Sequence, residues 1–127
     1  MYNILSETHR HARTKKLAYV VGADCNARVG QRATEDDRRT PGQYDFGSVN
    51  VRGQWLKNWA ATEKLRIMNT FYHTHAHNLT TYTSPQKQQH QIDFILASKL
   101  VWKTATDCEA TTDIDLGSDH KALRFTF

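Results

Sequence analysis

Apolar residues recur along the chain in patterns that predict two amphipathic helices. Residues 4–14 set a few apolar side chains on a background of Glu, His, Arg and Lys, and the cations near their end suit a helix C-terminus. Residues 54–64 bring Trp55 and Trp59 onto one face through spacings of three and four residues. Both tryptophans are therefore expected in the core.

Other segments have the pattern of β-strands. Residues 17–21 are continuously apolar and close on Gly22, which predicts a strand in the interior of a sheet rather than at its edge. Asp93 belongs to a second apolar segment, between Ile92 and residues 94–96. Further strands are predicted at residues 66–72, 79–83, 101–108 and 122–127.

The order of these elements predicts a layered α+β fold. Residues 26–50 are rich in Gly, Arg, Asp and Thr and predict a loop of a length that is uncommon unless it is functional. The chain thus runs helix, strand, loop, helix and then mainly strands. Its 127 residues contain no internal repeat or linker, so residues 1–127 are expected to form one domain.

The charge balance points to a polyanionic partner. The formal net charge is +4 with neutral histidines and the pI is about 9.2, which favours encounters with nucleic acid. An ordinary solvated surface is the alternative. Five arginines in one loop-rich third could set positive potential beside phosphates: Arg28, Arg32, Arg38, Arg39 and Arg52.

Several classes of protein are disfavoured. No apolar run approaches the roughly 20 residues that span a bilayer, so no membrane partner is expected. The first residues lack the sustained apolar stretch of a secretory signal, so we expect an intracellular location, nuclear or cytoplasmic. Cys25 and Cys108 are too few for a disulfide framework and are expected to be reduced, partly buried thiols.

The candidate chemistry lies at strand ends. An unpaired carboxylate at Asp93 would be costly to bury among apolar neighbours, so it needs a partner. His120 is a suitable one, because a carboxylate fixes the tautomer of an imidazole and raises its basicity. Alternatively, Asp93 faces outward and contacts Lys or Arg. Asp119, beside His120, could bind a hard divalent cation such as Mg²⁺.

A second pair of polar residues follows the strand at residues 17–21. Asp24 and Asn26 flank Cys25, so on an extended segment their side chains would point the same way. The acid could deprotonate a water while the amide donates to a phosphoryl oxygen. The alternative is a turn in which both residues bond nearby backbone.

These motifs resemble the endonuclease/exonuclease/phosphatase superfamily, most closely the apurinic-like endonucleases of non-LTR (LINE-type) retrotransposons and craniofacial-development-protein-2-like sequences. The resemblance implies the C-terminal half of a four-layer α/β sandwich of the DNase I-like fold, with mixed β-sheets flanked by helices. Six segments carry it, in the order of the family: residues 22–30 (GADCNARVG), 50–53 (NVRG), 69–71 (NTF), 81–85 (TYTSP), 91–96 (QIDFIL) and 118–120 (SDH).

By this resemblance, catalysis would depend on four residues. Asp24 would align or activate the attacking water, and Asn26 would stabilise the pentacovalent phosphorus. Asp93 and His120 would form the carboxylate–histidine pair whose imidazole contacts the scissile phosphate.

The resemblance also implies a metal and a substrate. Asp119 would lie close to Mg²⁺ or Mn²⁺, and DNA is a more favoured substrate than RNA. Residues expected to bind substrate are Thr81, Arg28 and Ser118.

Family members carry a preceding segment with a strand Asn, the main metal-ligating Glu and a catalytic Tyr or His. We therefore expect a partial domain with weak or absent hydrolysis and an exposed sheet surface that favours self-association. The alternatives are a non-catalytic remnant that binds nucleic acid, and a phosphatase or lipid phosphodiesterase of the same superfamily.

A separate hypothesis concerns three alternating histidines, His73, His75 and His77. On a strand they would project from one face and could bind Zn²⁺ or Ni²⁺. The alternative is a loop between strands.

Overall fold

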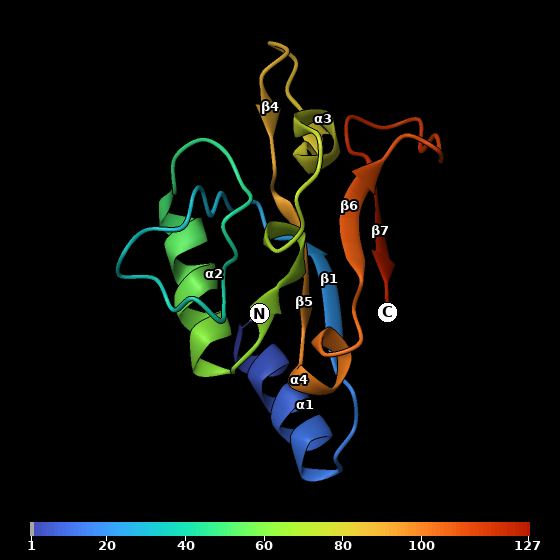
Figure 1. The fold of residues 1–127 in the computed structure, drawn as a ribbon. Coiled ribbons are helices and arrows are strands. Elements are labelled where there is room, and N and C mark those ends of the chain that lie inside the picture. The colour runs from blue at the N-terminus through green and yellow to red at the C-terminus, as the bar shows by residue number, and fades with distance from the viewer. Residues whose placement is uncertain (1) are drawn as a thin grey trace.

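The computed structural model describes residues 2–127 (Figure 1). None of the described helices is both long enough and apolar enough to cross a bilayer. The helices and strands are α1 Tyr2–Thr14, β1 Val20–Asp24, α2 Val51–Thr62, β2 Arg66–Ile67, the 3₁₀ helix η1 Met68–Thr70, α3 Ala76–Leu79, β3 Tyr82–Thr83, β4 Gln89–His90, β5 Asp93–Ala97, α4 Lys99–Trp102, β6 Asp107–Thr111 and β7 Ala122–Thr126.

The centre of the fold is a three-stranded antiparallel sheet in the order β1-β5-β2. Two further antiparallel pairs, β3-β4 and β6-β7, complete the described strands. Figure 1 shows α2 on one side of β5 and the β6-β7 pair on the other. The mixed helices and antiparallel sheets confirm the predicted α+β class.

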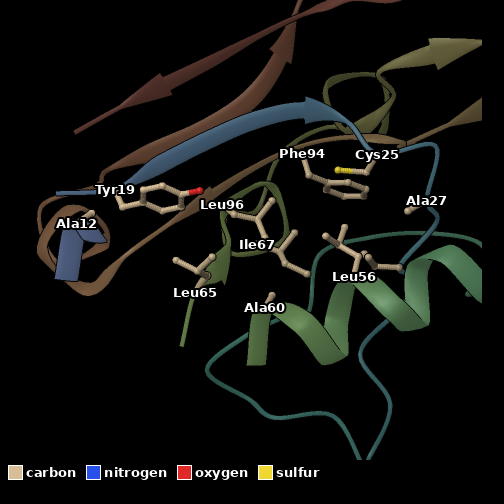
Figure 2. Close-up of a cluster of buried hydrophobic side chains, with 11 residues drawn as sticks. Ala12, Tyr19, Cys25, Ala27, Leu56, Ala60, Leu65, Ile67, Phe94 and Leu96 are labelled. Atoms are coloured by element: carbon tan, nitrogen blue, oxygen red, sulfur yellow. The ribbon is translucent and has the colours of Figure 1, made fainter. Parts of the chain in front are cut away.

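Strand β5 divides the interior into two apolar clusters because its side chains alternate between its faces. Phe94 and Leu96 pack on one side against Leu56 and Ala60 of α2, as Figure 2 shows. On the other face, Ala97 packs with apolar residues of η1, α4 and β6, and Ile95 and Phe125 flank this second cluster. The sheet is thus fixed from both sides along the strand that carries Asp93.

Several sequence predictions differ from the structure. The strand predicted at residues 17–21 spans Val20–Asp24 and lies at an edge of the sheet, and Leu17 is 56% exposed. The prediction of an interior strand is wrong because β1 pairs with β5 alone, which leaves its other edge unpaired. The side chains on one face of β1 are also exposed. Trp55 is also not in the core, since it is 59% exposed on the outer side of α2. Trp59 is half-buried against Tyr2.

The other strand predictions were partly right. The strand predicted at residues 66–72 is only Arg66–Ile67, because the chain turns into η1. Residues 101–108 combine the end of α4 with the start of β6.

The long loop at residues 26–50 is tied to the start of α2. Asn50 caps this helix: its Oδ1 accepts hydrogen bonds from the amides of Gly53, at 2.7 Å, and Arg28, at 3.0 Å. A Cβ at Gly53 would lie 1.8 Å from the carbonyl oxygen of Arg28, so only glycine fits there. The cap therefore fixes the backbone that follows Asp24 as well as the helix.

The middle of the same loop contains buried charges. Lys57 of α2 forms an ion pair with Asp36 at 3.0 Å, and both side chains are only 5% exposed. Nearby, Asp45 is buried, and one of its oxygens accepts from the amide of Phe46 at 2.7 Å. Burial raises the pKa of Asp45 from 3.8 to about 7, although Phe46, Gln91 and Lys57 oppose the shift. This carboxyl is thus kept largely protonated in mildly acidic solution.

We expect Asn50→Ala to lower the free energy of unfolding by about 1–2 kcal/mol, because it removes the cap and leaves the amides of Gly53 and Arg28 without their acceptor. Urea unfolding measures the loss. Asn50→Asp keeps an oxygen at this position and serves as the control. Equal stability of the alanine variant and the unsubstituted protein would contradict the assigned cap.

We expect Asp45 to make the protein less stable as pH rises from 5 to 8. Between pH 3.8 and about 7 the folded chain holds a proton that the unfolded chain has released, so unfolding is favoured by raising the pH. Asp45→Asn should remove this loss of unfolding free energy, which totals about a few kcal/mol over the interval. Asp37→Asn, at an exposed site with a lowered pKa, should leave the slope unchanged in the same urea titrations. Identical slopes for Asp45→Asn and the unsubstituted protein would contradict a buried, protonated carboxyl.

Candidate active site

Two carboxylates face each other across neighbouring strands. Asp24, the last residue of β1, is the direct antiparallel partner of Asp93, the first residue of β5. Residues opposite one another in a ladder project from the same face, and like charges in this arrangement repel. The pair therefore needs a cation or a hydrogen-bond donor between its members.

His120 provides that donor. Its Nδ1 lies 2.9 Å from one oxygen of Asp93 and 3.2 Å from the other, while its Nε2 lies 4.0 Å from Oδ2 of Asp24. Because a carboxylate only accepts, Nδ1 carries the proton and the tautomer leaves Nε2 available beside Asp24. The predicted Asp93–His120 contact is confirmed, and the alternative of Asp93 facing Lys or Arg is wrong.

A short backbone ladder positions His120. Residues 119–121 pair with residues 81–83 through two hydrogen bonds, from Thr83 N to Asp119 O at 3.1 Å and from Lys121 N to Thr81 O at 2.8 Å. The rings of Tyr82 and His120 lie 4.9 Å apart, so the phenol packs against the imidazole. Pairing with residues 81–83 therefore places the side chain of His120 beside the start of β5.

Thr81 is a positioning residue in this structure rather than a surface contact. Its side chain is fully buried, and its Oγ1 accepts from the amides of Ile92, at 3.0 Å, and Asp93, at 3.1 Å. Because the hydroxyl does not reach the surface, substrate binding by Thr81 stays a prediction. The hydroxyl instead fixes the start of β5.

Asn69 has a similar role that the sequence analysis did not assign. Its Nδ2 donates to the carbonyl of Asp93 at 3.0 Å, and its Oδ1 accepts from the amide of Ile95 at 2.9 Å. Asn69 is 1% exposed. The available signal was an amide residue placed directly after an apolar pair, where burial requires hydrogen-bond partners.

Asn26 does not lie on an extended segment. Its φ of 46° is left-handed, and its amide donates to Oδ1 of Asp24 at 2.9 Å, which forms the turn that the sequence analysis held as the alternative. The prediction that both side chains point the same way along a strand is therefore wrong. The turn leaves Oδ2 of Asp24 as the oxygen nearer to His120.

A small hollow of about 240 Å³ adjoins this cluster. Its lining includes Tyr82, whose ring also packs on His120, so the imidazole lies behind the wall of the hollow rather than in its lining. Two predicted site residues, Asn26 and Arg28, line it together. The complete lining is Asn26, Arg28, Asn50, Tyr82, His90 and Ile92.

Ser118 and Asp119 have positions that differ from their predicted roles. Ser118 is exposed, and its Oγ accepts from the amide of His120 at 3.1 Å, so it supports the histidine's backbone. Asp119 is also exposed, and its carboxylate lies outside the cluster of potential metal ligands. The backbone ladder explains this, because adjacent residues project to opposite sides and His120 occupies the inner position.

The cluster that could hold a cation consists of Asp24, Asp93 and His120, whose ligand atoms lie within 4.8 Å of one another. The fit to Mg²⁺ or Mn²⁺ is partial. Oδ2 of Asp24 is a free hard ligand, whereas both oxygens of Asp93 contact the imidazole. Mg²⁺ often binds through one or two carboxylates completed by waters and substrate phosphates, which this donor set permits.

Cys25, between Asp24 and Asn26, is a buried thiol that favours its protonated form. Burial raises the pKa of its thiol to about 12, and the charges of Asp24 and Asp93 add to the rise. Within residues 2–127, both cysteines are free and buried, as expected of structural thiols.

The three alternating histidines form no metal group among the described residues. His73 packs on Tyr44, whereas His75 and His77 stack at 5.5 Å around the start of α3. The strand that the metal hypothesis required is not formed there, and the loop alternative holds for His73 and His75.

Two arginines of the long loop, Arg28 and Arg39, line different hollows. Arg28 lines the hollow with Ile92, near the start of β5. Arg39 lines a different groove with Ser98, which follows the end of β5. These two members of the predicted cluster therefore lie at different ends of the sheet.

No protein-family model matches this chain, and no curated protein sequence matches it. The candidate site is therefore defined by the geometry of its residues.

The tautomer of His120 can be measured by ¹⁵N NMR of the imidazole. We expect Nδ1 to be protonated in the unsubstituted protein, and Asp93→Ala to abolish that preference by removing the acceptor. Asp119→Ala should leave the tautomer unchanged, because that carboxylate lies outside the cluster. A dominant Nε2–H tautomer in the unsubstituted protein would contradict the assigned pair.

Proposed function

We propose that the chain takes part in divalent-metal-dependent hydrolysis of a phosphodiester, of the endonuclease type. The observation that carries this proposal is the pair of opposed carboxylates, Asp24 and Asp93, with His120 between them. A site of this kind combines a proton acceptor with a donor to an anionic substrate, held on rigid strand ends. We further propose that the sheets belong to a DNase I-like sandwich, as the motif resemblance implies.

His120 would act on the phosphate. In its protonated form, Nε2–H donates to a non-bridging phosphoryl oxygen, whose charge grows as the attacking oxygen approaches. Asp93 stabilises this imidazolium through its 2.9 Å contact with Nδ1 and holds the ring in place. Tyr82 restricts the ring from the other side.

Asp24 would act on the water. Its Oδ1 is engaged by the amide of Asn26, so Oδ2 accepts the proton as the water oxygen bonds to phosphorus and the bond to the leaving sugar oxygen breaks. The leaving oxygen takes a proton from solvent. Because Oδ2 has two lone pairs, the same oxygen could also hold a divalent ion, which would supply charge neutralisation at the phosphate.

The hollow beside Tyr82 suits the neighbouring part of a nucleic acid. Arg28 can pair with a backbone phosphate, and Asn26 and Asn50 offer amide groups. The rings of Tyr82 and His90, stacked at 6.4 Å, offer an aromatic surface to a base. These features favour DNA or RNA over a lipid substrate.

A second candidate function is binding of nucleic acid without hydrolysis. It is favoured by the small ligand set, since the described residues supply two carboxylates to the cluster and one of them is engaged by His120. Such a protein would bind nucleic acid through Arg28 and the other residues that line the hollow, and it would bind a divalent ion only weakly.

Nicking of supercoiled plasmid in Mg²⁺ or Mn²⁺ tests the proposal. We expect Asp24→Asn and His120→Ala each to lower the rate by at least about 100-fold, with circular dichroism unchanged. Asp113→Asn, an exposed carboxylate outside the cluster, is the matched control and should nick at the unsubstituted rate.

The outcomes separate the two candidates. Nicking that survives both substitutions, or that persists in EDTA, would contradict the proposed site. Absence of nicking together with duplex binding that weakens steeply with salt would establish the second candidate instead.

A further inference from the structure

A larger groove lies at the opposite end of the sheet from Asp24 and Asp93. It has a volume of about 720 Å³ and is formed by α1, the end of α2 and α4. Leu17, which precedes β1, and Ser98, which follows β5, both line it. Figure 1 shows α1 and α4 together at that end, so the groove is separate from the candidate active site.

The groove gathers positive charge. Its lining contains five cationic side chains and two acidic ones, Asp37 and Glu63, which gives a formal charge of +3 with His9 neutral. The formal net charge of the whole chain is only +4, so most of the excess lies here rather than at the carboxylate cluster. The cations are Arg13, Lys16, Arg39, Lys64 and Lys99.

Apolar side chains line the same groove. Leu17 and Leu100 are 56% and 58% exposed, an unusual state for two leucines that share one depression. Trp102 also lines it, and its ring is held by the guanidinium of Arg66, 3.6 Å from the centroid. A cationic lining with exposed apolar side chains is complementary to an anion that carries an apolar body.

A buried polar group adds a second observation. His9 of α1 lines the groove and is only 2% exposed. Its Nε2 lies 3.0 Å from the carbonyl oxygen of Glu63, while its Nδ1 has no partner among the described residues. Buried ring nitrogens are normally hydrogen-bonded, so His9 is an unsatisfied polar group in the wall of this groove.

We propose that this groove binds a small organic anion with a planar apolar body, of the class of nucleoside monophosphates. Its volume falls within the range of roughly 300–1,000 Å³ that is typical of sites for small molecules. The phosphate pairs with cations such as Arg13 and Lys99, and the base lies against Leu17, Leu100 and Trp102. This inference does not rest on the proposed hydrolysis, which uses the other end of the sheet.

The experiment is a titration of the full chain with adenosine 5′-monophosphate, followed by amide NMR. We expect shifts at residues around Leu17 and Ser98 and none at Asp24 or His120. Adenosine alone and inorganic phosphate alone should each bind at least about tenfold more weakly. Adenosine contacts only the apolar side chains, and phosphate contacts only the cations.

Charge-matched variants complete the test. Arg13→Gln with Lys99→Gln should weaken binding about tenfold, since two exposed charge contacts contribute roughly 1–2 kcal/mol together. Arg52→Gln with Lys87→Gln removes the same charge elsewhere and should leave affinity within about twofold. Urea midpoints should be equal for both double variants.

Three results would overturn the proposal. They are an unchanged affinity in Arg13→Gln with Lys99→Gln, adenosine binding as tightly as the monophosphate, and absence of groove shifts at about 5 mM ligand. Shifts confined to the Asp24 end are a form of the third result, and they would place the ligand at the candidate active site instead.

Discussion

The opposition of Asp24 and Asp93 is the constraint on which the candidate site depends. Two carboxylates paired across a ladder repel, and their strands stay in register because the flanking residues of β5 are packed on both faces. His120 offsets this repulsion, because its Nδ1 donates a hydrogen bond to Asp93 while its Nε2 faces Asp24. Core packing thus fixes the strand register, and the strand register fixes the position of the two acids in the site.

Buried hydrogen bonds fix the backbone of the two acids, though not that of His120. Thr81 and Asn69 are buried polar residues whose side chains each form two hydrogen bonds with the backbone of residues 92–95. Asn50 performs the same task for the backbone after Asp24, through Arg28. Each acid therefore has its own set of side chains that fix its main chain, which is what a preorganised site requires.

The sequence predicted what depends on local pattern and chemistry. The α+β class, the strand of Asp93 and its need for His120 followed from periodicity and from the cost of burying a carboxylate. What depends on neighbours was missed. The apolar run at residues 17–21 does not show that β1 pairs along one edge only. The turn after Asp24 depends on the left-handed backbone of Asn26, which the sequence pattern does not predict. The burial of Thr81 depends on the segments packed around it in the folded chain.

The short ladder that delivers His120 has a consequence for how the site fails. Only two backbone hydrogen bonds join residues 119–121 to residues 81–83, and the preceding residues 112–119 are exposed. Segments held this weakly open at a free energy below that of global unfolding. On warming, the imidazole would separate from the two acids while the helices and the central sheet persist, so the candidate site would come apart before the fold melts.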